Sequence, residues 1–263
     1  MKKRIAMLAV LSTAAVMSAV TPSFFTADQA SLIMAAESGW VEEFDGWRYL
    51  DSDGDYLTDS WKKRDGEMYY LDEDGKVATD TIIDDEYYVD ATGKRVAEQW
   101  VSVYNEDGMD SMDASEFLWY YFGRDGRAVK SKWYKVGDNW HYFNSDGHML
   151  TGKQEIDGNT YYLGDENDGA RKSGWILLEE DSDDPDHSSF WYYFDQKGRM
   201  IENQIDKKID GSYYTFVDGK MQTGWFKLPE EESTASDSNA APLHKEGTIH
   251  GYQYYEANGK RAA

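Results

Sequence analysis

Residues 132–152 read KWYKVGDNWHYFNSDGHMLTG, and this stretch decides the fold. It holds two short aromatic runs that are separated by a Gly-containing turn, and a second Gly turn follows the second run. Two strands of about five residues joined by a tight turn fit this length. Glycine in such a turn supplies the positive φ angle that the turn requires. The stretch therefore predicts a β-hairpin.

The same unit recurs about nine times between residue 39 and residue 263. Each copy contains an aromatic pair, and the second residues of these pairs are Tyr49, Tyr70, Tyr88, Tyr121, Tyr142, Tyr162, Tyr193, Tyr214 and Tyr255. The intervals are 21, 18, 33, 21, 20, 31, 21 and 41 residues. A single hairpin of this size is marginally stable, so neighbouring hairpins must cover each other's aromatic faces. We predict an all-β solenoid of about nine stacked β-hairpin repeats.

The three long intervals come from acidic inserts near 104–117, 179–190 and 229–251. Each insert lies between the leading Trp of its unit and the aromatic pair. Their composition is typical of exposed loops. They are either solubilising loops or a contact surface for a protein partner, and the sequence leaves both interpretations open.

The N-terminal segment has the pattern of an export signal. Lys2, Lys3 and Arg4 precede an apolar run from residue 5 to residue 20. This order is typical of a secretory signal, and the run is short for a membrane span. We expect residues 1–36 to be a cleaved signal peptide and residues 37–263 to form the repeat domain. The expected product is secreted and has no membrane span after signal cleavage.

Composition excludes several classes of function. The chain has 27 Lys and Arg against 50 Asp and Glu, a net charge of −23, which would be repelled by nucleic acid and by an anionic membrane. It has no Cys, so no disulfide or thiolate metal site is possible. The carboxylate-rich stretch 51–59 lacks the Gly at the sixth position of a calcium loop. With no catalytic or nucleotide-binding motif either, we expect no metal, no cofactor and no enzymatic activity.

Tryptophan recurs at two positions of the unit, one leading and one just before the aromatic pair. Both positions hold Trp only in the first, fourth, fifth and seventh units. These rings could simply pack between hairpins, which is the favoured interpretation for the Tyr positions. Two indoles with a neighbouring Tyr also form an electron-rich cage, which suits a quaternary ammonium held by cation–π attraction.

The repeated pattern resembles the choline-binding, or cell-wall-binding, repeats of Gram-positive surface proteins. The best local matches are the stretch 132–152, WYYFDQKGRMIENQ from Trp191, and KIDGSYYTFVDGKMQTGW from Lys208. The resemblance implies a left-handed superhelix in which each hairpin turns by about a third of a revolution. It also implies that choline sits between consecutive hairpins, caged by two Trp of one unit and a Tyr of the next, with a Met often closing the site.

Carried over residue by residue, the resemblance implies four choline cages. They are Trp40 and Trp47 with Tyr70; Trp100 and Trp119 with Tyr142 and Met149; Trp133 and Trp140 with Tyr162; and Trp175 and Trp191 with Tyr214 and Met221.

The implied function is that of a non-enzymatic protein anchored at the bacterial cell surface through choline of teichoic or lipoteichoic acid. Related repeats in glucan-binding domains and clostridial toxin tails make a cell-wall glycan the competing ligand. In a further alternative the repeats are only a scaffold, and the acidic inserts contact a host protein. An unrecognised hydrolase is a third possibility, but the chain shows no identifiable catalytic fold.

Overall fold

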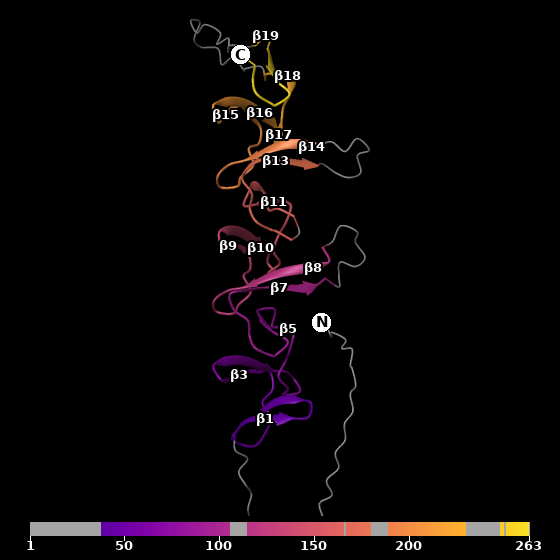
Figure 1. The fold of residues 1–263 in the computed structure, drawn as a ribbon, viewed down its shortest axis with the longest axis vertical. Helices are drawn as coiled ribbons and strands as arrows, with labels where there is room; N and C mark the ends of the chain where they lie inside the picture. The colour runs from indigo at the N-terminus through magenta and orange to yellow at the C-terminus, as the bar shows by residue number, and fades with distance from the viewer. Residues whose placement is uncertain are drawn as a thin grey trace, which may run out of the picture.

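The computed structural model describes residues 38–105, 115–165, 167–179, 189–229, 248–249 and 251–262. Nine antiparallel hairpins follow one another in these ranges and stack into a rod (Figure 1). All the regular elements described are strands. The predicted all-β stack of nine hairpins is confirmed. The expected signal peptide and the acidic inserts lie almost wholly outside the described residues.

We number the hairpins one to nine in chain order. Their strands are β1 (Gly39–Glu43) with β2 (Gly46–Leu50), β3 (Ser60–Arg64) with β4 (Glu67–Leu71), β5 (Thr81–Ile83) with β6 (Tyr87–Val89), β7 (Gln99–Tyr104) with β8 (Phe117–Phe122), β9 (Lys132–Val136) with β10 (Asn139–Phe143), β11 (Lys153–Ile156) with β12 (Asn159–Tyr162), β13 (Gly174–Glu179) with β14 (Ser189–Phe194), β15 (Gln204–Ile209) with β16 (Ser212–Val217) and β17 (Lys220–Met221), and β18 (Gly224–Lys227) with β20 (Tyr252–Tyr255) and β19 (Thr248–Ile249).

Tight turns close the short hairpins, as the Gly pattern predicted. Asp65 and Gly66 join β3 to β4 with φ angles of 50° and 92°. Asp157 and Gly158 join β11 to β12 with φ angles of 50° and 70°. Two successive positive φ angles are the conformation whose twist matches an antiparallel hairpin, and Asp-Gly tolerates it well.

A second turn links each hairpin to its neighbour. In hairpin five, Asn144 Oδ1 accepts hydrogen bonds from the backbone N–H groups of Asp146 and His148. The chain then reverses, and the N–H of Met149 donates to the carbonyl of Trp119 in hairpin four at 2.8 Å. We call the residue in this place, two after the turn Gly, the bridging residue.

Equivalent bridging bonds recur along the rod. The acceptors lie at Trp47, Met68, Glu86, Trp119, Trp140, Thr160 and Tyr213, and the matching donors are Val77, Arg95, Ala128, Met149, Arg171, Met200 and Arg261. Each bond holds the bridging residue beside the second strand of the preceding hairpin. The side chain at this position therefore lies at the junction between two hairpins.

The hydrophobic core includes a column of fully buried residues, one of them near the end of the second strand of each hairpin but the first. From hairpin two to hairpin nine these residues are Leu71, Val89, Phe122, Phe143, Leu163, Phe194, Phe216 and Tyr255, each at most 1% exposed. Each buried side chain of this size contributes roughly 1.5–3 kcal/mol through the hydrophobic effect. The column holds neighbouring hairpins together, because no hairpin could bury such a residue alone.

The hairpins repeat their direction every three units. In Figure 1, β7, β8, β13 and β14 project to the right like β1, whereas β3, β9 and β15 lie on the left. Hairpins one, four and seven thus form one edge of the rod, and hairpins two, five and eight form another. No described segment forms a helix with the length and hydropathy of a membrane span.

Candidate functional site: aromatic cages between hairpins

The two Trp residues of a unit share one face of their hairpin. In hairpin four, Trp100 lies opposite Tyr121, and Ser102 lies opposite Trp119. Residues directly opposite each other in an antiparallel pair point to the same face, so Trp100 and Trp119 are diagonal neighbours on it. Their ring centroids are 6.4 Å apart and the planes cross at 81°.

The inserts do not disturb this geometry. Hairpin seven pairs Trp175 with Tyr193 and Leu177 with Trp191, the same register as in hairpin four. Hairpin five has no insert, and it pairs Trp133 with Tyr142 in the same way. The ladders continue to the pairs Tyr104 with Phe117 and Glu179 with Ser189, so the Trp pairs stay together although they are distant in sequence.

The third ring of each cage comes from the next hairpin. Trp40 meets Tyr69 at 5.7 Å, and Trp133 meets Tyr161 at 4.9 Å. Trp100 meets a histidine, His141, at 5.0 Å. The first tyrosine of the aromatic pair, or the residue that replaces it, supplies this ring.

The tyrosines expected at three of these places lie one residue further along. Tyr70 and Tyr142 pack on the Trp of their own hairpins, at 5.2 Å from Trp61 and 5.3 Å from Trp133. Tyr162 lies 6.4 Å from Phe194. Successive residues of a strand point to opposite faces, so a shift of one position moves the ring to the other side of the hairpin.

In hairpin seven the structure brings together Trp175 and Tyr214, two of the residues that the sequence grouped. Trp175 meets Tyr214 at 4.8 Å. In hairpin eight, Thr215 separates the pair Tyr213 and Tyr214 from the buried Phe216. The pair is therefore displaced by one residue relative to the other hairpins, and its second Tyr faces hairpin seven. Met221 packs in the same cluster as Trp175 and Tyr214, and Met149 packs with Trp100 in the cluster of hairpin four.

Arginine side chains of the protein occupy two of the expected cages. The Cζ of Arg64 lies 3.5 Å from the ring centroid of Trp47 and 5.9 Å from that of Trp40. The Cζ of Arg171 lies 5.5 Å from Trp133 and 5.8 Å from Trp140. These distances are within the range of cation–π attraction.

The cages of hairpins four and seven are open by contrast. Among the described residues, no Lys or Arg head group lies over the rings of Trp100, Trp119, Trp175 or Trp191. The side chain of Trp191 is 43% exposed, so that cage is accessible from solvent. A methionine, rather than an arginine, stands at the bridging position of both.

His141 gives the cage of hairpin four a titratable wall. It is 6% exposed, and its Nδ1 has no hydrogen-bond partner in the described part of the chain. Burial lowers the pKa of His141 below its ordinary value of 6.5, which the carbonyl of Gly169 and the charge of Asp168 oppose. The imidazole is therefore neutral at pH 7 and does not repel a cation.

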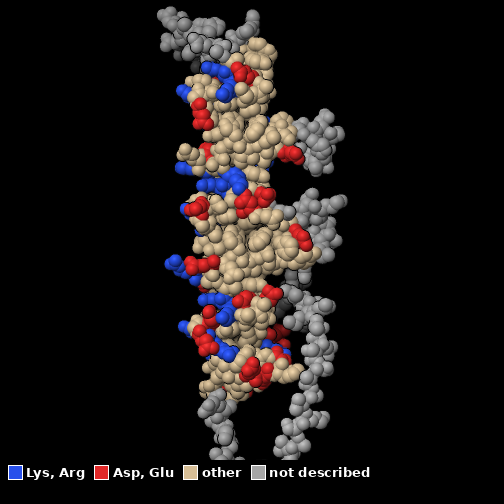
Figure 2. Space-filling view, viewed as in Figure 1, with Lys and Arg blue, Asp and Glu red and all other residues tan. Residues whose placement is uncertain are grey.

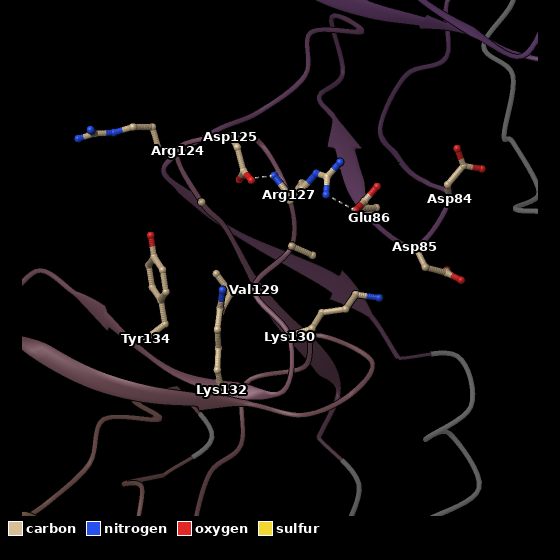
Figure 3. A pocket seen from close by; sticks show the side chains of 12 residues that line it. Asp84, Asp85, Glu86, Arg124, Asp125, Arg127, Val129, Lys130, Lys132 and Tyr134 are labelled. Atoms are coloured by element: carbon tan, nitrogen blue, oxygen red, sulfur yellow. Dashed lines mark hydrogen bonds and ion pairs between the residues drawn. The ribbon is translucent and has the colours of Figure 1, made fainter.

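A separate groove lies between hairpins three, four and five. It has a volume of about 810 Å³ and is lined by charged residues of both signs, among them Asp84, Asp125 and Arg127, together with Tyr134 (Figure 3). Arg127 forms an ion pair with Glu86 at 3.2 Å across one side of it. This groove is distinct from the aromatic cages and was not expected from the sequence.

No group of three or more His, Cys, Asp or Glu side chains in the described ranges is placed to hold a metal ion.

Comparison with known protein families identifies the repeats. Models of the choline-binding repeat match residues 56–94 and 129–175, and a model of a cell wall binding repeat matches residues 191–200. These parts of the chain are therefore similar to choline-binding repeats, which supports a module of the cell-wall-binding type.

Streptococcal proteins carry similar repeats. Glucosyltransferase-S of Streptococcus downei is 31% identical over 119 residues, which are 45% of this chain and 8% of that protein. Glucosyltransferase-S of Streptococcus mutans is 26% identical over 183 residues, which are 68% of this chain and 10% of that protein. The choline-binding repeats thus correspond to about a tenth of the length of these relatives.

The fold is also that of a solved structure. The modular autolysin LytC of Streptococcus pneumoniae is 17% identical, with a TM-score of 0.50 over 86% of this chain and 47% of that chain. The likeness supports the stacked-hairpin architecture of the choline-binding-repeat module.

The sequence interpretation missed Arg64, Arg95, Arg171 and His141. A signal for two of the arginines was present in the repeats. Arg95 and Arg171 stand two residues after the turn Gly, where Met149 and Met221 stand in other units. Aligning the units on that Gly would have exposed the alternation between arginine and methionine.

Proposed function

We propose that this chain is a secreted, non-enzymatic cell-surface protein that holds choline of teichoic or lipoteichoic acid in the cages of hairpins four and seven. The open cage of hairpin four carries this proposal. Trp100 contacts Trp119 at 6.4 Å and His141 at 5.0 Å, and Met149 packs in the same cluster as Trp100. A quaternary ammonium donates no hydrogen bond, so aromatic faces are the walls that suit it.

The expected affinity of one cage is modest. Three aromatic walls at roughly 0.5–2 kcal/mol each give about 1.5–6 kcal/mol, which brackets the ~4 kcal/mol of a millimolar site. Two cages on one edge of the rod can engage two choline groups of the same polymer. Linked binding of this kind raises the apparent affinity well above that of either site. The net charge of −23 assists by attracting cations.

The test is a titration of choline into the protein without residues 1–36, followed by Trp fluorescence, with ethanolamine and a short α-glucan as control ligands. We expect a saturable, choline-selective response. W119A and W191A should each remove one site. W140A is the matched control, because Trp140 belongs to a cage that Arg171 already fills. A wild-type protein that does not respond to choline at tens of millimolar would refute the proposal.

A second candidate ligand is a cell-wall or related glycan. The matches to repeats of two glucosyltransferases and the polar groove beside Tyr134 favour it. Sugar rings stack on an aromatic face while polar walls hydrogen-bond their hydroxyl groups. A response to the α-glucan that is lost in Y134A, together with no response to choline, would favour this candidate. A partner protein at the acidic inserts stays a hypothesis, because the inserts lie outside the described residues except at their ends.

A further inference from the structure

We infer that the protein's own arginines fill the aromatic slots along the edge formed by hairpins two, five and eight, so that these slots exclude external cations. This inference rests on the proposed function. It goes further by stating which junctions between hairpins can bind a ligand and which residue determines this. The deciding feature is the bridging residue, which is an arginine at this edge and a methionine in hairpins four and seven.

The three arginines of this edge have equivalent backbone positions, and Arg261 differs in that it also forms an ion pair with Asp206 at 2.8 Å. Arg95 has its Cζ 5.7 Å from the ring centroid of Trp61 and 5.4 Å from that of Tyr87. Arg171 lies at 5.5 Å and 5.8 Å from two indoles, as described above. Arg261 lies 4.5 Å from Tyr213. Each is held by its backbone N–H, which donates to the second strand of the hairpin whose slot it fills.

The arrangement follows the superhelix. Three hairpins complete one repeat of direction, so a residue type that alternates with period three collects on one edge (Figure 1). In Figure 2, Lys and Arg lie on the left of the rod, where β3, β9 and β15 are found, and also across its middle, with Asp and Glu among them. The edge of hairpins four and seven instead carries the two open cages. Hairpin one shares that edge, but Arg64 fills its cage from the neighbouring strand.

A covalently attached guanidinium competes strongly with a free ligand. Its effective concentration at the cage is that of an intramolecular partner, at least millimolar by order of magnitude. Its planar group also stacks on indole faces, which an ammonium cannot do. Within the described part of the chain, no carboxylate forms an ion pair with Arg95 or Arg171, so the rings are the partners of these two charges. Choline would have to displace them to enter.

The decisive variant is R171M. It gives hairpin five two Trp, a Tyr and a bridging Met, the same set of residue types as hairpin seven. We expect R171M to bind one more choline per chain than the wild type in equilibrium dialysis. R124M is the matched control, because Arg124 is 90% exposed and pairs with Glu98 outside the cages. It removes the same charge and should leave the number of bound cholines unchanged.

The comparison with wild type separates this inference from the proposed function. A gain of one site in R171M supports the inference whether the wild type binds choline or not. A folded R171M that gains no site overturns it. If R171M does not fold, NMR of the arginine side chains in the wild type tests whether they fill the aromatic slots. Ring-current shifts of Arg171 and Arg95 relative to Arg124 support filled slots, and their absence overturns the inference.

Discussion

Choline binding to the cage of hairpin four should weaken in acid, whereas binding to the cage of hairpin seven should not. The difference is the third wall, which is His141 in the first cage and Tyr214 in the second. His141 lies 5.0 Å from Trp100 and is 6% exposed. Burial lowers its pKa below 6.5, Asp168 acts in the opposite direction, and Lys172 adds to the lowering.

The direction and the magnitude of this pH effect follow from the environment of His141. Because the pKa of His141 is lowered in the folded protein, the imidazole stays neutral from alkaline pH down through 6.5 and is protonated only below that. A protonated ring about 6 Å from the bound ammonium, at an effective dielectric constant near 20, repels it by roughly 3 kcal/mol. The protonated form of the cage should therefore bind choline about 100-fold more weakly than the neutral form, and the observed affinity falls as the protonated fraction grows. The same proton binds more readily to the unfolded chain, so the stability of this region also falls as the pH drops below 6.5.

The assay is a choline titration of W191A, in which only the cage of hairpin four remains, at pH ~7.5 and pH ~5, on either side of the ordinary histidine pKa. W119A, which keeps only the cage of hairpin seven, is the control and should have the same affinity at both pH values. H141Y should bind choline with little dependence on pH. Equal affinities of W191A at the two pH values would refute the reasoning, and so would a pH dependence that persists in H141Y.

Two further substitutions test the packing. G169A should weaken choline binding in hairpin four in the same titration. Gly169 has a φ of 57°, and an added Cβ would lie 2.3 Å from Met149 Sδ. G158A is the control, because Gly158 has a similar φ but open space around it, so this substitution should change stability alone. Y255F should destabilise the C-terminal hairpins by about 1–3 kcal/mol in urea unfolding, because it removes a buried hydrogen bond of 2.6 Å to Thr215. Burial raises the pKa of Tyr255 to about 12, so the wild type should lose stability between pH 10 and 12, and Y255F should lack that loss; an identical alkaline loss in both proteins would contradict this account.

The sequence predicts the hairpins and their stacking well because these depend on local signals. Asp65-Gly66 requires a tight turn, and short aromatic runs on either side can only bury their rings against another copy. The buried column follows from the same periodicity, although one member per hairpin could not be singled out without the register.

The third ring was assigned one residue too far along in the cages of hairpins one, four and five for that reason. Tyr69 and Tyr70 are adjacent and chemically identical, and only the strand register decides that Tyr69 faces Trp40. No composition or spacing argument separates two tyrosines in succession. The arginine fillings were missed for a different reason, since a basic residue beside a turn is ordinarily a solvated charge. Its role becomes visible only when the fold brings Arg171 over the rings of the preceding hairpin.

The contrast between filled and open cages bears on where function lies. A cage that holds an internal guanidinium gains its cation–π attraction in the folded protein without any ligand. In an open cage the aromatic faces are left without that partner. A sequence selected for stability alone could fill hairpins four and seven with arginine as it fills hairpin five. Departures from the locally stabilising choice are expected at functional sites, so the two methionine-bridged cages are the places where ligand binding explains the residues that are present.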